Sequence, residues 1–109
     1  MSSILEEFVK NQEESEVKTN FDLKYMGLGI GGEVGEILNE IKKIERDDDN
    51  KITTQRKQKL ILELGDVMWY LQGICKRLNV TIEEVLQANI TKLKNKNKNK
   101  NRNNSKKQN

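Results

Sequence analysis

The sequence contains no proline, no histidine and only one cysteine, Cys75. Without histidine, the common zinc sites and Ser-His-Asp triads cannot be built. A lone cysteine excludes a disulfide within the chain, which fits a reducing, intracellular setting. Any metal site must therefore rely on oxygen ligands, which favour a hard cation such as Mg²⁺, Mn²⁺ or Ca²⁺.

Aromatic residues are also scarce, at 5% of the chain, whereas charged residues make up 34%. Sheets usually draw on aromatic and β-branched residues, and their turns often use proline, so this composition favours helices. No apolar run approaches the roughly 20 residues of a membrane-spanning helix. The opening MSSILEEFVKNQEE carries charges where a signal peptide would need an apolar stretch. We expect a soluble, cytoplasmic protein with no membrane partner.

The net charge of +3 averages two unlike parts of the chain. Residues 92–109 contain eight basic residues and no acidic ones, whereas the first 91 residues hold 12 basic and 17 acidic residues, a net charge of −5. The Asn/Lys repeat that ends the chain has nothing to bury, so we expect residues 95–109 to form a disordered basic tail. Residues 1–94 would form one helical domain.

Apolar residues recur every three or four positions in several stretches, which is typical of amphipathic helices. We expect helices over residues 3–14, 21–46, 55–78 and 82–93, the last capped by Thr81 with Glu84 in a capping box. The expected fold is all-α, an antiparallel bundle of about four helices. So short a domain buries only roughly 60–65% of its unfolded surface. We therefore expect oligomerisation, as a homodimer or homotetramer, to complete the bundle.

Five glycines crowd the first half of the second expected helix, at positions 27, 29, 31, 32 and 35. Each glycine costs a helix up to about 1 kcal/mol relative to alanine. Either this helix begins near Gly32, or the glycines permit close approach of another backbone or of a ligand. The sequence leaves both alternatives open.

Two pairs of carboxylates lie in apolar, glycine-flanked surroundings, Glu33 with Glu36 and Glu63 with Asp66. Residues three apart share a helix face, so each pair points in one direction. Antiparallel neighbouring helices could bring both pairs to one spot, where their repulsion would require protons or a divalent cation such as Mg²⁺. Solvated helix charges are the alternative, and Glu40, one turn further along, is expected to be an exposed charge of that kind.

The residues also match a known pattern. LGIGGEVGEILNEIKK (28–43) and LELGDVMWYLQGICKRLNVTIEEVLQANITKL (62–93) closely resemble the MazG-like proteins of the all-α NTP pyrophosphohydrolase superfamily. The family signature pairs E-x-x-E with E-x-x-D, and here 26 residues separate Glu36 from Glu63. The resemblance covers about residues 23–93 and departs after Leu93, where many relatives continue with an arginine and an aromatic residue. Lys96 is the nearest candidate for that arginine's role.

The resemblance implies hydrolysis of a nucleoside triphosphate, often a deoxynucleotide, to the monophosphate and pyrophosphate. It implies that Glu33, Glu36, Glu63 and Asp66 are catalytic residues that bind Mg²⁺, with Mn²⁺ as a second candidate. It further implies that Asn89 and Lys92 contact the substrate, Lys92 by offering positive charge to a phosphate.

Two alternatives to an enzyme follow from the same sequence. The basic tail would attract nucleic acid weakly and without sequence preference, which suits a helical module tethered to RNA or DNA. A dimeric helical scaffold without activity is the other alternative. Trp69 and Tyr70 are expected to be core or interface residues, with stacking on a nucleobase as the less favoured interpretation.

Overall fold

The computed structural model describes residues 3–16 and 21–107, with side chains described as far as residue 101. It contains four helices and no strand within those ranges, so the all-α prediction is confirmed. The helices are α1 (Ser3–Ser15), α2 (Leu23–Asp47), α3 (Thr54–Arg77) and α4 (Ile82–Lys107). None of the described helices is long and apolar enough to cross a membrane.

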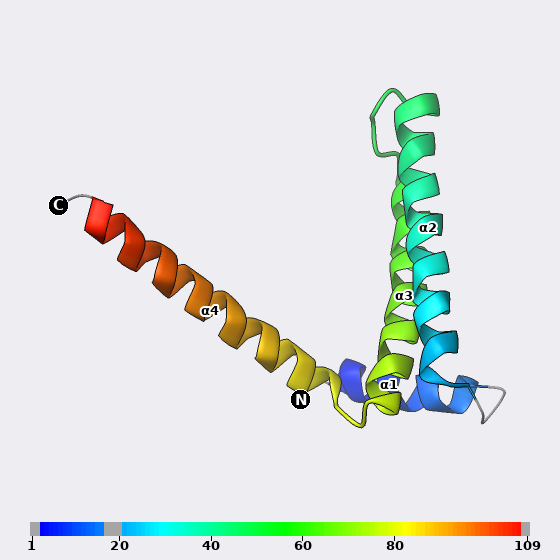
Figure 1. The fold of residues 1–109 in the computed structure, drawn as a ribbon. Coiled ribbons are helices and arrows are strands. Elements are labelled where there is room, and N and C mark those ends of the chain that lie inside the picture. The colour runs from blue at the N-terminus through cyan, green and yellow to red at the C-terminus, as the bar shows by residue number, and fades with distance from the viewer. Residues whose placement is uncertain (1–2, 17–20, 108–109) are drawn as a thin grey trace. The chain divides into compact units, whose positions relative to one another are not determined.

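Helices α2 and α3 form an antiparallel hairpin, and α1 lies across its open end (Figure 1). Each hairpin helix begins at a side-chain cap: Asp22 accepts a hydrogen bond from the Tyr25 amide at 2.8 Å, and Thr53 accepts one from the Arg56 amide at 3.2 Å. Such caps satisfy amides that lack a partner in the first helical turn. The short turn between α2 and α3 therefore fixes both helices side by side, as predicted.

Hydrogen bonds from Arg56 stabilise the turn between α2 and α3. Its guanidinium donates to Asp48 at 2.7 Å and to Glu40 at 3.4 Å. Asp49 and Asn50 adopt positive φ values of 55° and 62°, a conformation in which these residue types are enriched. The expectation that Glu40 is an exposed charge is wrong, because Glu40 is 5% exposed and pairs with Arg56 and Lys43. A buried carboxylate needs such partners.

Helices α2 and α3 approach closely near the open end of the hairpin, and two glycines permit it. A Cβ at Gly29 would collide with the Tyr70 ring, and one at Gly73 would lie 2.6 Å from the Met26 sulfur. Met26 is fully buried there. Helix α2 begins at Leu23 and runs through all five glycines, so the alternative start near Gly32 is wrong. Close approach explains Gly29, whereas Cβ atoms at Gly27, Gly31, Gly32 and Gly35 would meet open space.

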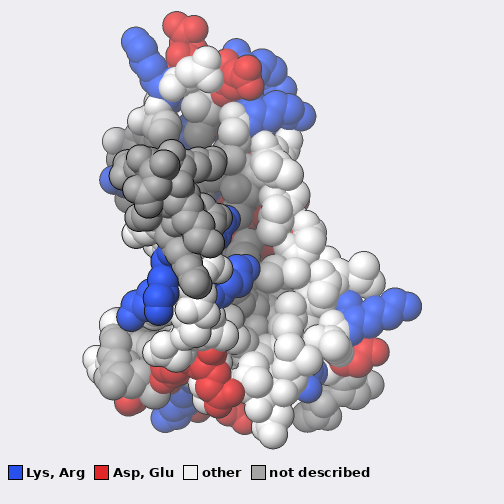
Figure 2. Space-filling model, turned by 60° about the vertical axis from the view of Figure 1, so that its left-hand side comes forward, with Lys and Arg blue, Asp and Glu red and all other residues white. Residues whose placement is uncertain are grey.

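Few apolar side chains of residues 1–78 are buried. Met26, Ile44 and Cys75 are, together with the polar side chains of Gln12, Glu40, Glu63 and Gln72. Many large apolar residues of the hairpin stay exposed, such as Leu38 at 62% and Leu64 at 54%. In Figure 2, basic and acidic side chains gather at the top, around the α2–α3 turn, and below them uncharged described surface lies between further basic and acidic groups. The hairpin therefore presents apolar surface that its own helices do not cover.

The chain divides into two compact units, residues 1–78 and residues 79–109. The second unit contains α4, which follows Asn79 at a φ of 56° and begins after Thr81. The Thr81 hydroxyl accepts a hydrogen bond from the Glu84 amide at 3.0 Å, so the predicted cap is present.

Helix α4 is longer than the sequence suggested. We expected disorder from residue 95, and the structure instead continues the helix to Lys107. Residues 95–109 contain no glycine or proline that would stop a helix, and lysine has a good helix propensity. Residues 84–101 are all exposed, in keeping with a segment that has nothing to bury. The division of the chain into a domain ending at residue 94 and a separate tail stays a prediction.

Candidate metal centre

Three carboxylates meet on the α2–α3 hairpin. Glu33 of α2 and both Glu63 and Asp66 of α3 each offer an oxygen, and these oxygens lie within 4.8 Å of one another. Glu63 and Asp66 share one face of α3 because they are three residues apart. The antiparallel pairing of the helices places Glu33 opposite them. The sequence-based expectation that both motifs converge thus holds for these three residues.

The cluster lies partly within the protein. Glu63 is 8% exposed, Glu33 is half-buried and Asp66 is exposed. Burial raises the pKa of the Glu33 carboxyl, and the negative charges of Asp66, Glu63 and Glu36 raise it further, as does the hydrogen bond that protonated Glu33 donates to the Glu63 carboxylate. Crowded carboxylates hold a proton more firmly when no cation offsets their repulsion.

Lys59 partly offsets this negative charge. Its ammonium nitrogen lies 3.6 Å from a Glu63 oxygen, one turn earlier on α3. The Lys59 side chain is 54% exposed, so water screens much of this attraction. One screened lysine beside three carboxylates leaves the cluster with net negative charge.

Glu36 lies just outside the cluster. Its side chain is exposed, and its oxygens are not among those within 4.8 Å. It is nevertheless close enough for its charge to raise the pKa of Glu33. The structure therefore brings together three of the four predicted ligands, and the role of Glu36 stays a prediction.

The donor set fits a hard divalent cation. Carboxylate oxygens from two helices are the ligands that Mg²⁺ uses, usually one or two of them, with water and substrate phosphates completing the shell. The half-buried Glu33 and the buried Glu63 would gain from such a cation, because it would relieve the repulsion that raises the pKa of Glu33. The arrangement can therefore hold Mg²⁺ or Mn²⁺ while leaving positions open for a phosphate.

A hollow of about 310 Å³ adjoins the carboxylates and is lined by Glu33, Asp66, Trp69 and Tyr70. We call it the acidic–aromatic hollow. Burial, and after it the neighbouring Tyr25, raises the pKa of the Tyr70 phenol, so Tyr70 stays neutral at physiological pH. From the sequence we expected Trp69 and Tyr70 to be core or interface residues, with stacking on a nucleobase as the less favoured interpretation. Their place beside Glu33 and Asp66 was not predicted. Their spacing from Asp66, three and four residues along α3, was the signal that could have found it.

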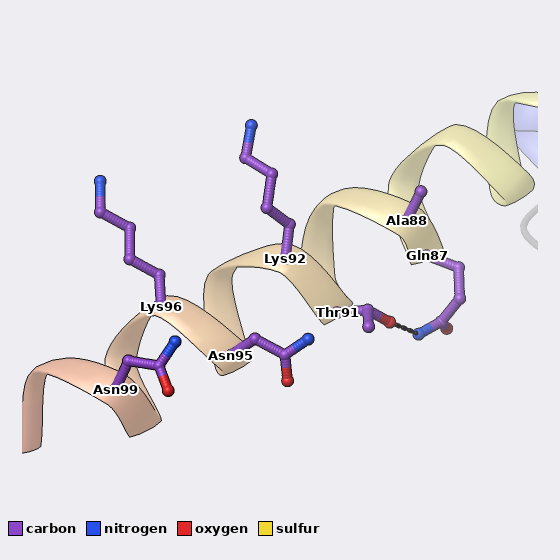
Figure 3. Close-up of a pocket in the computed structure, with 7 residues that line it drawn as sticks. All are labelled: Gln87, Ala88, Thr91, Lys92, Asn95, Lys96 and Asn99. Atoms are coloured by element: carbon purple, nitrogen blue, oxygen red, sulfur yellow. Dashed lines mark hydrogen bonds between the residues drawn. The ribbon is translucent and has the colours of Figure 1, made fainter. Parts of the chain in front are cut away.

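The two predicted substrate-binding residues, Asn89 and Lys92, both lie on α4. Lys92 lines a second hollow, of about 730 Å³, along one face of this helix, and Asn89 is not among its lining residues. The lining residues are Gln87, Ala88, Thr91, Lys92, Asn95, Lys96 and Asn99. Figure 3 shows Lys92 and Lys96, one turn apart, extending in the same direction from the helix. Substrate binding by Asn89 and Lys92 stays a prediction.

Comparison with known proteins extends this description. Residues 21–100 match the MazG nucleotide pyrophosphohydrolase domain, a stretch that includes all four predicted ligands as well as Asn89 and Lys92. The chain belongs to the MazG family. This confirms the resemblance found in the sequence.

A relative of this MazG protein is the Gene 37 protein of Mycobacterium phage L5. The two are 46% identical over 71 residues, which cover 65% of this chain and 62% of the phage protein. The chain thus matches less than two thirds of its relative's length. No solved structure matches this MazG chain.

Proposed function

We propose that this protein hydrolyses a nucleoside triphosphate, with a deoxynucleoside triphosphate as the expected substrate, to the monophosphate and pyrophosphate in a Mg²⁺-dependent reaction. One phosphoanhydride bond is broken and one water molecule is added. The protein would act in the cytoplasm, where its single, buried cysteine stays reduced.

The observation that carries this proposal is the meeting of Glu33, Glu63 and Asp66 within 4.8 Å in a chain of the MazG family. These residues come from two helices and are separated by up to 33 positions in the sequence. Solvated helix charges, the alternative interpretation, would be expected to point away from one another, because exposed like charges repel. Their convergence favours a cation site.

Each carboxylate has a distinct setting. The buried Glu63 would bind the cation with an oxygen that Lys59 also approaches, whereas the exposed Asp66 lies where substrate phosphates can reach it. The exposed Glu36 would be the fourth ligand or would accept a proton from the attacking water. When bound, Mg²⁺ supplies neutralisation of phosphate charge and a more acidic water. Lys92 and Asn89 of α4 would hold phosphate oxygens by donating hydrogen bonds.

The test is pyrophosphate release from a panel of ribonucleoside and deoxyribonucleoside triphosphates, with and without Mg²⁺. We expect metal-dependent release that falls at least a hundredfold in Glu33→Gln and Asp66→Asn, since each variant removes one ligand charge without changing size. Glu36→Gln measures whether the residue outside the cluster also takes part.

Glu45→Gln is the matched control, because Glu45 is an exposed carboxylate of α2 about three turns beyond Glu33. It should hydrolyse at the native rate. Absence of release from every nucleotide, by folded protein with Mg²⁺ or Mn²⁺, would contradict the proposal and favour a scaffold. Equal losses in the control and in the cluster variants would contradict the assigned ligands.

We further propose that a second copy of the chain covers the apolar surface of the hairpin. Exposed residues of α2 recur at helical spacing in Val34, Leu38 and Ile41, and exposed residues of α3 do so in Ile61, Leu64 and Met68. Each set forms one stripe along its helix. Stripes of this kind bury well against another helix pair, as in helical bundles.

Sedimentation of the native chain should give a mass at least twice that of the 12.7 kDa protomer. Leu38→Lys should shift the protein toward the monomer, because it places a charge in the stripe. Leu62→Lys is the matched control, since Leu62 is 68% exposed and lies outside both stripes. A native monomer at all concentrations would contradict the proposed assembly.

A further inference from the structure

We propose that Trp69 is the residue against which the nucleobase of the substrate stacks. This inference rests on the proposed nucleotide hydrolysis and adds to it a place for the base. It concerns the acidic–aromatic hollow, in which Trp69 lies beside Glu33 and Asp66.

The few aromatic residues of the chain are clustered. The chain has five, and four of them form a continuous array whose members Trp69 and Tyr70 lie beside the carboxylates. Phe21 stacks on Tyr25 with ring centres 4.1 Å apart, Tyr25 lies 6.5 Å from Tyr70, and Trp69 meets Tyr70 edge to face at 4.9 Å. A chain so poor in aromatic residues thus places two of them beside its acidic cluster and two more in contact with that pair.

The chemistry of the acidic–aromatic hollow also suits a nucleotide. Its lining combines carboxylates, which suit a cation and its attached phosphates, with two flat aromatic rings. A nucleotide presents the same two features side by side, a charged phosphate chain and a flat base. The volume of about 310 Å³ is at the lower end of the range for small-molecule sites. This space suits a base and its sugar, with the phosphates extending along the carboxylates.

Trp69 is better placed than Tyr70 to contact the base. The Tyr70 ring occupies the space above Gly29, where any Cβ would collide with it, and so it is committed to packing α2 against α3. Trp69 is half-buried and keeps part of its surface open. Tyr70 therefore packs edge to face against the Trp69 ring and helps to hold it in place.

The orientation of Trp69 is fixed by α1. Its indole N–H donates to the Ser15 hydroxyl at 2.7 Å, and that hydroxyl in turn donates to the Gln12 carbonyl at 2.9 Å. The only hydrogen-bond donor of the side chain is thus used within the protein. The ring can recognise a base only through its face, and stacking of this kind tolerates every base. We therefore expect Trp69 to distinguish nucleotides from base-free phosphates and to contribute little to the choice among bases.

Trp69 is the single tryptophan of the chain, so its fluorescence reports directly on the hollow. The experiment titrates the native protein, with Mg²⁺ present, with nucleoside monophosphates, the products of the proposed reaction, and separately with ribose 5-phosphate, which has no base. We expect saturable quenching by the monophosphates of all bases and none by ribose 5-phosphate at the same concentrations. Equal responses to both ligands, or no response to any monophosphate, would overturn the inference.

Variants measured by calorimetry separate stacking from folding. Trp69→Leu should weaken monophosphate binding roughly 10- to 100-fold, as loss of one base–aromatic stack does, and Trp69→Phe should restore most of it. Phe8→Leu is the matched control, because Phe8 is the aromatic residue outside the array. This variant should bind monophosphates with native affinity. Native affinity in Trp69→Leu would overturn the inference even if hydrolysis were established. Binding that requires a base, in a protein that hydrolyses no triphosphate, would instead support the role of Trp69 while contradicting the proposed reaction.

Discussion

Arg77 of α3 donates hydrogen bonds to both carboxylate oxygens of Glu16, a residue 61 positions earlier in the sequence. The pair joins the end of α1 to the end of α3, and only 5% of the Glu16 side chain is exposed. The hydrogen bond from Arg77 is the main reason that the pKa of Glu16 lies below its ordinary value. Since Ser15 also binds Trp69, this pair holds α1 against the wall of the acidic–aromatic hollow.

Glu16→Gln should lower the free energy of unfolding by about 1.5–3 kcal/mol at pH 7, the range for hydrogen bonds to charged groups. A lowered folded-state pKa means that the stabilisation is present above the unfolded-state pKa and is lost as pH falls through the folded-state value. Urea denaturation should therefore show that the native chain and Glu16→Gln differ less in free energy of unfolding at pH 3 than at pH 7. Glu13→Gln, which removes an exposed pair with Lys76, should change little. A loss that is equal at both pH values would contradict this account.

Gly29→Ala should destabilise the protein relative to Gly31→Ala. The added methyl at position 29 meets the Tyr70 ring, which is packed between Tyr25 and Trp69 and cannot easily move. At position 31 it meets open space and should gain up to about 1 kcal/mol from helix propensity. Thermal unfolding of the two variants compares them directly. A similar rise in unfolding temperature in both variants would show that α2 and α3 separate more readily than the structure indicates.

Mg²⁺ should raise the unfolding temperature more at pH 7.5 than at pH 5. The pKa of Glu33 is raised in the folded protein, so metal-free stability falls as pH rises from the unfolded-state pKa through the folded-state value. A cation reverses this because it needs the ionised carboxylate. Glu33→Gln should be more stable than the native chain without metal at pH 7.5 and should respond weakly to Mg²⁺. A native response in this variant would exclude Glu33 as a ligand.

Neutralising the basic end of α4 should separate enzyme from nucleic-acid binder. The variant replaces Lys98, Lys100, Arg102, Lys106 and Lys107 by glutamine, which keeps helix propensity and leaves Lys92 and Lys96 in place. We expect native pyrophosphate release and weaker, less salt-dependent retention on heparin or DNA. Loss of hydrolysis with the protein still folded would show that these charges serve the reaction.

The helices could be predicted from sequence because each has a periodic apolar face and, before α4, the Thr81 cap. The bounds of α1, α2 and α3 agree with the predicted ranges to within about two residues. Pairing of Glu33 with Glu63 and Asp66 followed from the short turn between antiparallel helices. The extension of α4 could not be predicted, because it rests on helix propensity and its side chains as far as residue 101 are all exposed.

The burial of Glu40 also could not be predicted from the sequence. Its burial depends on Arg56, which lies 16 positions away and reaches back across the turn between α2 and α3. The spacing along α3 places Trp69 near Asp66, but the orientation of the Trp69 indole could not be predicted, for a related reason. The indole is oriented by Ser15 on α1, a contact across 54 positions that no periodic pattern encodes.

The glycines of α2 have a dynamic consequence. Gly27, Gly31, Gly32 and Gly35 relieve no steric conflict within the hairpin, yet together they cost the helix on the order of 3–4 kcal/mol relative to alanine. The turns around Glu33 should therefore open locally at a lower free energy than the facing turns of α3, and their amides should exchange with deuterium sooner. A ligand that binds Glu33 would slow this exchange, so the segment would become ordered as the substrate site fills.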